Sequence, residues 1–246
     1  MAEATGCFQG QVAVVTGASS GIGRAIALDF ARHGAKVCLV ARHRHGLESV
    51  ADQVRGNGGE SQVCCADISR DQEIRTLAET VQSSLGRVDI LVLCGGTIAH
   101  GTLERATLAD FDTQYSSNLR GNYALVQAML PLLRRQKGQI VFINSSAGMK
   151  ASGGSGQHSA IQYALRAIAD SLREEVNADG IRVLSVYPGR TATPRTARLF
   201  EKEGRPYRPE LLMQPEDVAA MVTSALRLPR TAEVTDISLR SMLKSY

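Results

Sequence analysis

The stretch Thr16-Gly17-Ala18-Ser19-Ser20-Gly21-Ile22-Gly23 spaces three glycines as GxxxGxG. It directly follows the apolar run QVAVVT at 11–16, which predicts a buried strand. It also opens an amphipathic stretch at 21–33, which is typical of a helix. The first glycine permits a tight turn, and the other two let the backbone of the helix pack closely against the strand. A strand, a glycine turn and a helix in this order predict the first unit of an α/β fold.

The alternation of apolar runs and amphipathic stretches continues along the rest of the chain. Strands that are apolar on both faces and separated by helices predict a parallel sheet covered on both sides. Ser69, with Gln72 three residues later, predicts a capping box that opens a helix ending near Leu85. Further strands are expected at 36–41, 61–66, 88–93, 139–144, 182–187 and 233–237. Further helices are expected up to Arg55 and at 108–133, 157–177 and 215–228.

Length and composition predict one soluble domain that spans residues 1–246. The chain is 43% hydrophobic and 21% charged, which is ordinary for a globular protein, and it has no linker or repeat. One irregular region at 190–213 is rich in Arg, Pro and Thr. Because it follows the strand at 182–187, we expect it to form a lid with a short mobile helix beside a ligand crevice.

Several classes of function and location are disfavoured by the composition. The net charge of +4 is spread along the chain, so no basic stripe indicates nucleic-acid binding. No apolar run approaches the roughly 20 residues that span a bilayer, and the first residues do not resemble a signal peptide. The five cysteines have no metal-ligand spacing and are expected to be reduced thiols. These observations predict a cytoplasmic protein with no metal site and no membrane or nucleic-acid partner.

The glycine turn itself indicates a phosphate-bearing ligand. The N-terminus of the following helix offers free N–H groups and a favourable dipole to an anion. The alternative is an ordinary glycine-rich turn, but the position between a strand and a helix is the context that a dinucleotide-binding motif requires.

At this point the sequence resembles the short-chain dehydrogenase/reductase family over nearly its whole length. The resemblance rests on TGASSGIG, on Asp67 in CADIS, on Asn118 in NLRG, on Ser145 in NSSAG and on PGRTAT at 188–193. It implies a Rossmann-type, doubly wound parallel sheet of about seven strands in three α/β/α layers. It also implies a nicotinamide dinucleotide cofactor and a small carbonyl or alcohol substrate.

The resemblance also implies which residues form the site. The catalytic positions are Asn118, Ser145, His158 and Gln162. The cofactor-binding positions are Thr16, Gly17, Ser19, Ser20, Gly21, Ile22, Gly23, Arg42, Asp67, Ile68, Gly95, Pro188, Gly189, Thr191 and Thr193.

The end of the second predicted strand indicates which dinucleotide is preferred. An acidic residue there would bind the ribose 2′-hydroxyl of NAD, but this chain reads Val40-Ala41-Arg42-His43-Arg44. Arg42 could instead bind the 2′-phosphate of NADP, because a guanidinium binds phosphate bidentately. The sequence therefore favours NADP over NAD. The alternative is that Arg42 and Arg44 are solvated residues at the start of a helix.

The family's catalytic Tyr and Lys are missing from this sequence. The family places a Tyr 13 residues after its catalytic Ser and a Lys four residues after the Tyr, and these positions hold His158 and Gln162. Tyr163 lies five residues after His158, so it is expected off the active-site face of the helix. His158 has a reference pKa near ~6.5 and could donate a proton at neutral pH.

Two hypotheses follow from this departure. The chain is an NADP(H)-dependent oxidoreductase that uses Ser145 and His158 as an atypical pair, or it is a catalytically silent subunit in which His158 and Gln162 are relics. A second departure lies at Leu93-Cys94-Gly95-Gly96, where the family has NNAG, and it places local rigidity in doubt. Cys94 itself is interpreted as a small hydrophobic residue rather than a nucleophile.

Two surface features remain open. The helices at 108–133 and 157–177 carry apolar residues on more than one face, which favours a homo- or hetero-oligomer as well as a core stripe. The region 190–213 contains Arg190, Arg195, Arg198, Arg205 and Arg208. These arginines hint at an anionic substrate, although a solvated lid is the commoner outcome.

Overall fold

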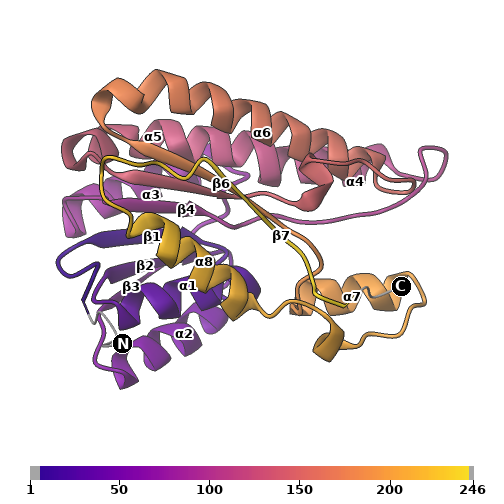
Figure 1. Cartoon of the computed structure of the whole chain (residues 1–246), viewed down its shortest axis with the longest axis horizontal. Helices are drawn as coiled ribbons and strands as arrows, with labels where there is room; N and C mark the ends of the chain where they lie inside the picture. The colour runs from indigo at the N-terminus through magenta and orange to yellow at the C-terminus, as the bar shows by residue number, and fades with distance from the viewer. Residues whose placement is uncertain (1–5, 244–246) are drawn as a thin grey trace.

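The computed structural model describes residues 6–243, which form one parallel sheet with helices on both faces (Figure 1). The seven strands run in the order β3-β2-β1-β4-β5-β6-β7. Every neighbouring pair is parallel, and the chain reverses its direction of travel across the sheet between β3 and β4. The predicted doubly wound fold is therefore confirmed. The strands are β1 Val12–Thr16, β2 Lys36–Ala41, β3 Ser61–Cys65, β4 Ile90–Leu93, β5 Gln139–Ile143, β6 Arg182–Pro188 and β7 Asp236–Leu239.

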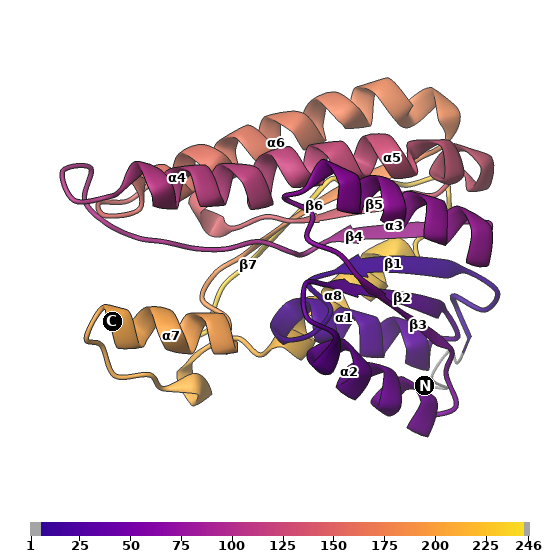
Figure 2. The same cartoon turned by 180° about the vertical axis from the view of Figure 1, so that it is seen from behind.

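Helices cover the two faces of the sheet as separate layers, which Figures 1 and 2 show from opposite sides. One layer contains α1 Gly21–Arg32, α2 Arg44–Gly56 and α8 Pro215–Leu226. The other contains α3 Asp71–Ser84, α5 Gly121–Gln136 and α6 Gly156–Val176. Helix α7, Pro194–Lys202, stands apart from both layers. Short 3-10 turns occur at Ser146–Gly148, Asn177–Asp179 and Pro209–Leu211.

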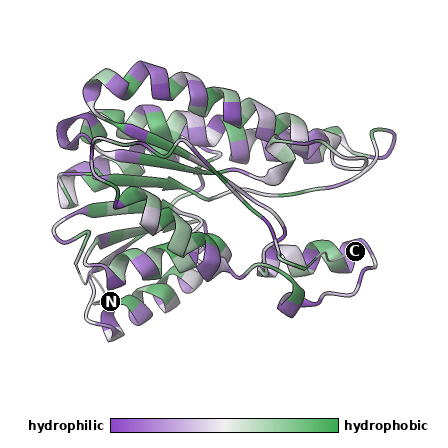
Figure 3. Cartoon of the chain, in the orientation of Figure 1, coloured by the Kyte–Doolittle hydropathy of each residue, from purple (hydrophilic) through white to green (hydrophobic). Residues whose placement is uncertain are grey.

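The strands are apolar on both faces because each face is buried beneath a helical layer. In β1, Val15 packs into the core on the α1 side, whereas its neighbour Val14 packs into the core on the α5 side. Figure 3 shows the same pattern, with hydrophobic colouring along the strands and mixed colouring on the helices. None of the helices in the described part of the chain is long and apolar enough to cross a bilayer.

The helix expected at 108–133 is interrupted by a π-helical turn. Helix α4, Leu108–Gln114, passes into the π-helix Tyr115–Arg120, and α5 then continues to Gln136. A π-turn inserts an extra residue into the helical repeat, and such turns often occur at functional sites. Here the turn contains Asn118, one of the residues expected at the site.

Several predicted element ends differ from the structure by a few residues, and for two of them a competing partner is identified. Helix α3 begins at Asp71 after Arg70, and Ser69 does not cap it. The Ser69 side chain instead donates to Asp67 Oδ1 at 2.7 Å, because this local partner competes with the helix N-terminus. The last strand begins at Asp236, not at 233, since Glu233 uses its carboxylate to accept from the backbone N–H of Val183.

Candidate functional site

A cavity of about 1210 Å³ opens at the carboxyl ends of the strands. Every site residue that the sequence analysis predicted lines it, although those residues come from distant parts of the chain. The position agrees with the rule that ligands of doubly wound sheets bind where the strand order reverses. The volume lies slightly above the usual range for a single small-molecule site, roughly 300–1000 Å³. There is room for a ligand of dinucleotide size together with a small second molecule.

The glycine turn at one end of the cavity has no space for side chains. Gly17 has φ +66°, and a Cβ on it would lie 2.9 Å from the carbonyl oxygen of Cys94. A Cβ on Gly23 would lie 2.5 Å from the carbonyl oxygen of Gly17. The side chain of Ser20 makes no capping bond to α1, and the backbone N–H of Gly23 faces the thiol of Cys94, so the other first-turn N–H groups keep their capacity to bind an anion. The turn therefore fits the phosphates of a dinucleotide.

Thr16 joins the ends of β1 and β4 beneath this turn. Its hydroxyl oxygen accepts from the backbone N–H of Cys94 at 2.9 Å and of Gly95 at 3.0 Å. The hydroxyl donates to the carbonyl of Val92 at 3.3 Å. This one side chain braces the segment whose rigidity the departure from NNAG had placed in doubt.

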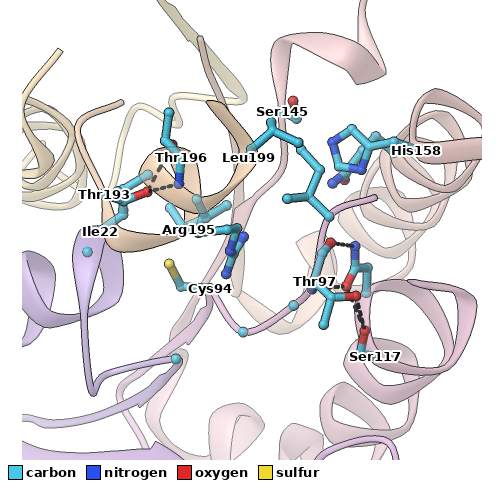
Figure 4. A pocket seen from close by; sticks show the side chains of 18 of the residues that line it. Ile22, Cys94, Thr97, Ser117, Ser145, His158, Thr193, Arg195, Thr196 and Leu199 are labelled. Carbon is cyan, nitrogen blue, oxygen red and sulfur yellow. Dashed lines mark hydrogen bonds between the residues drawn. The ribbon is translucent and has the colours of Figure 1, made fainter. Parts of the chain in front are cut away.

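Asn118 holds the next part of the same loop. Its Oδ1 accepts from the backbone N–H of Thr97 and its Nδ2 donates to the carbonyl of Thr97, both at 2.7 Å. The Ser117 hydroxyl donates to the same Oδ1 at 2.8 Å (Figure 4). The amide is thus fully engaged with the loop after β4, and it positions Thr97 at the edge of the cavity.

At the other side of the glycine turn, Arg42 and Asp67 line the cavity. Arg42 has no hydrogen bond or ion pair within residues 6–243, whereas Arg44 pairs with Glu48 at 2.9 Å outside the cavity. Burial by itself would raise the pKa of Asp67, but the two hydrogen bonds from Ser69 and the nearby charge of Arg42 lower it. Arg42 therefore presents a cation to the cavity beside an ionised carboxylate.

At the far end of the cavity, His158 is held by a side chain that the sequence analysis did not single out. His158 is only 5% exposed, and its Nδ1 lies 3.1 Å from Oε1 of Gln114. Nε2 of Gln114 donates to the carbonyls of Ala99 and Asp110, both at 3.4 Å, and these two acceptors orient the amide. The assignment leaves Oε1 of Gln114 as an acceptor, so the imidazole hydrogen is on Nδ1 and Nε2 is unprotonated.

The environment of His158 keeps its ring neutral. Burial, followed by the charges of His100 and Arg195, lowers its pKa from 6.5 to about 4. The rings of His100 and His158 lie 5.9 Å apart, centroid to centroid. Above pH 5 the ring is mostly neutral, and its one hydrogen points to Gln114. This corrects the expectation that His158 donates a proton at neutral pH.

Ser145 and Gln162 keep unused hydrogen-bonding capacity. Oγ of Ser145 accepts from the backbone N–H of Ala147 at 3.1 Å, and its hydrogen has no acceptor in the described part of the chain. Oε1 of Gln162 is buried without a partner in the same part. A buried polar atom without a partner is costly unless a ligand or water satisfies it. Both residues line the cavity, whereas Tyr163 donates to the carbonyl of Met149 outside it, as expected.

Helix α7 covers the cavity and is tied to the opposite wall. Nδ1 of His100 lies 2.9 Å from Oε1 of Glu203, which joins the loop after β4 to the end of α7. Figure 4 shows Arg195 and Leu199 extending from α7 into the cavity. The expected helix in the lid region therefore exists. The sequence analysis missed His100 and Gln114 because neither belongs to a recognisable motif. Their contacts are with residues far away in the sequence.

The remaining candidate groups are possible metal ligands and the Cys94 thiol. Within residues 6–243, no group of three or more His, Cys, Asp or Glu side chains is arranged to hold a metal ion. Burial raises the pKa of Cys94 to about 11, so this thiol is protonated at neutral pH and is a poor nucleophile.

Two curated proteins resemble this chain over most of its length. It is 36% identical over 238 residues to the glycine betaine reductase ATRR of Emericella nidulans, covering 94% of this chain but only 19% of that much longer protein. It is 32% identical over 237 residues to the sepiapterin reductase of Chlorobaculum tepidum, covering 93% of this chain and 95% of the relative.

Solved structures resemble this one over nearly the full length. An alcohol dehydrogenase from the archaeon Thermococcus sibiricus, in complex with 5-hydroxy-NADP, matches with TM-score 0.87 and 28% identity, over 96% of this chain and 98% of that one. A metagenomic short-chain oxidoreductase in complex with NADP matches with TM-score 0.83 and 29% identity, over 97% and 100%. The family model for short chain dehydrogenase matches residues 11–204. The chain therefore belongs to the short-chain dehydrogenase family.

Proposed function

We propose that this protein is an NADP(H)-dependent oxidoreductase that interconverts an alcohol and a carbonyl compound. The observation that carries the proposal is the single cavity that joins the glycine turn to Ser145 and His158. Family membership and the two NADP-containing structural neighbours support the same conclusion.

The residues that would hold the dinucleotide fall into three groups along the cavity. The backbone of the glycine turn and the N-terminus of α1 suit the diphosphate. Arg42, which has no partner within residues 6–243, suits the 2′-phosphate and favours NADP over NAD. The segment 188–193 borders the cavity where the nicotinamide end would lie. When bound, the cofactor exchanges a hydride with the substrate carbon.

His158 and Gln162 stand, in this proposal, where the family has Tyr and Lys. Ser145 donates its free hydroxyl hydrogen to the substrate oxygen. Nε2 of the neutral His158 accepts the hydrogen of an alcohol hydroxyl, so the O–H bond breaks and an N–H bond forms as the hydride leaves the carbon. Gln162 offers its unpaired Oε1 to a ribose hydroxyl without supplying a charge.

The low pKa of His158 sets the pH dependence of this chemistry. Reduction of a carbonyl needs the imidazolium form, which is scarce above pH 5 when the pKa is about 4. The rate of reduction should therefore rise as the pH falls towards 4. An enzyme with a Tyr–Lys pair has no such reason to depend on a group of this pKa.

Turnover by the purified protein tests the proposal. Oxidation of alcohols by NADP⁺ and reduction of ketones by NADPH are followed by absorbance for the wild type and for His158→Ala. A matched control is His45→Ala, an exposed histidine on α2 outside the cavity. The loss of an acid–base group should lower the rate by roughly 10²–10⁴-fold in His158→Ala. Equal rates in all three proteins would contradict the role of His158.

Cofactor preference is tested separately by binding. Arg42→Ala should weaken NADPH binding and leave NADH binding nearly unchanged, because only NADPH has the 2′-phosphate. Arg44→Ala removes the same charge from a residue that faces Glu48, and it should change neither affinity. An equal loss for both dinucleotides in Arg42→Ala would argue against this selection.

A second candidate function is a catalytically silent subunit that binds the dinucleotide and stabilises a partner. The uncharged Gln162 and the neutral His158 favour it, because neither supplies the positive charge of the family's Lys. Under this hypothesis the wild type binds NADPH without turnover, and the double variant His158→Tyr with Gln162→Lys gains a trace of activity. Turnover by the wild type that is lost in His158→Ala excludes it.

A further inference from the structure

Two arginines of α7 present unneutralised charge to the cavity. Arg195 and Arg198 both line it, and neither has a hydrogen bond or ion pair within residues 6–243. In Figure 4 the Arg195 side chain extends from α7 towards Cys94, on the side of the cavity that leads to His158. It is close enough for its charge to lower the pKa of His158. The charge therefore lies near the proposed reacting end.

The surrounding charge does not balance these two cations. Six Lys or Arg residues but only three Asp or Glu residues line the cavity. Two of the acids are already engaged, Asp67 with Ser69 and Glu203 with His100 and Arg205. Arg195 and Arg198 are exposed to the open cavity, and Arg195 lies within range of the positive charges of Arg198 and Arg42. An anion in this place would relieve the repulsion among the arginines.

The other arginines of the lid have different surroundings. The guanidinium groups of Arg190 and Arg205 both lie over the ring of Phe200, at 5.6 and 4.7 Å from its centroid. Arg205 also pairs with Glu203 at 3.1 Å. Arg208 does not line the cavity. Arg190 and Arg205 also line the cavity, but their contacts with Phe200, and that of Arg205 with Glu203, distinguish them from Arg195 and Arg198.

We propose that Arg195 and Arg198 form a subsite for an oxyanion, a carboxylate or a phosphate, carried by a ligand of this cavity. The proposal extends the proposed function and rests on it for the identity of the ligand. A guanidinium binds either group with two parallel hydrogen bonds. The anion has two possible sources, the diphosphate of the cofactor or an acid group on the substrate, which would then be a hydroxy or oxo acid.

Binding measurements on single variants test the subsite and identify the source. Arg195→Gln and Arg198→Gln are compared with wild type and with Arg208→Gln, which removes one charge from the same segment outside the cavity. The probes are NADPH, inorganic pyrophosphate, acetoacetate and methyl acetoacetate, which is the neutral ester of acetoacetate. Calorimetry measures the binding of NADPH and pyrophosphate. NMR titration measures the weaker binding of acetoacetate and its ester.

If the anion is the diphosphate of the cofactor, Arg195→Gln should weaken the binding of NADPH and of pyrophosphate by roughly tenfold, as expected for a lost charged hydrogen bond. Arg208→Gln should leave both affinities unchanged. A substrate source predicts unchanged NADPH and pyrophosphate binding but a similar loss for acetoacetate, with the ester binding weakly to every protein. Unchanged binding of all probes in both pocket variants would overturn the subsite.

The proposal and the proposed function can fail separately. If the wild type binds no NADPH, the proposed function fails, but pyrophosphate and acetoacetate still report on the arginines with the protein alone. If NADPH binds equally to all four proteins and neither small anion distinguishes them, the function stands and the oxyanion subsite does not.

Discussion

At the scale of single residues, the character of the site depends on the contact between His158 and Gln114. An imidazole in water titrates near pH 6.5, but this one is buried and its Nδ1 hydrogen is bound by an oriented amide. Within residues 6–243, the charged groups that act on it are His100 and Arg195, and both oppose its protonation. The residue is therefore arranged as a hydrogen-bond acceptor towards the cavity.

This environment predicts a specific dependence of stability on pH. The folded-state pKa of His158, about 4, lies below its ordinary value of 6.5, so the unfolded chain binds more protons between these values. The stability that His158 contributes is complete above pH 6.5 and decreases as the pH falls towards 4. Over that window the decrease should amount to roughly 3 kcal/mol.

Urea unfolding of the wild type and of His158→Asn, at pH 7.5 and at several values down to 4, measures this contribution. Asn can still bond to Gln114 but does not titrate, so the difference between the two proteins isolates the histidine from the carboxylates. Parallel pH curves for the two proteins would contradict a depressed pKa.

At the scale of elements, the β1–α1 turn is the part with the least tolerance for change. The backbone of Gly23 passes so close to Gly17 that a methyl group cannot be accommodated without moving the turn. The glycine turn and the first residues of α1 also line the cavity. Stability and ligand binding therefore depend on the same glycines.

Gly23→Ala should consequently lower the free energy of unfolding by roughly 1–3 kcal/mol and weaken NADPH binding. Gly156→Ala is the matched control, because a Cβ there meets nothing within 4 Å and the residue lies in α6. That control should be stabilising by about 0.4–1 kcal/mol, with unchanged binding. Denaturant melts and calorimetric titrations measure both effects, and a neutral Gly23→Ala would show that the turn adapts more easily than its geometry indicates.

At the scale of the whole molecule, the α4–α5 side carries apolar side chains that the monomer leaves exposed. The exposed apolar side chains follow one another along the interrupted helix and are those of Leu108, Phe111, Tyr115 and Tyr123. Neighbouring exposed apolar residues on a soluble protein often mark a contact surface. This placement supports the expectation of an oligomer, which stays a prediction.

We expect the purified chain to form homo-oligomers through this side. Light scattering after size exclusion should give a mass above that of one chain for the wild type and a smaller mass for Phe111→Glu with Tyr123→Glu, because buried carboxylates oppose association. Met221→Glu, an exposed apolar position on α8, should leave the mass unchanged. A monomeric wild type would contradict the prediction.

Much of the fold was predictable because it is encoded in short-range patterns. The apolar runs located all seven strands, with β2 correct at both ends, and the glycine turn located the switch from β1 to α1. The errors at Ser69 and Glu233 have one cause. Each side chain is bound by a partner, Asp67 or Val183, that competes with the local pattern.

By itself, the sequence determined the order of strands and helices, the position of the glycine turn and the absence of an acid after β2, since each is set by residue type and spacing. Only the tertiary structure decided that Gln114 binds His158, that Thr16 braces β4 and that Arg195 faces the cavity while Arg205 packs on Phe200. These contacts join segments that are distant in the chain. The charge state and hydrogen-bonding role of a side chain depend on such neighbours, and no local pattern contains them.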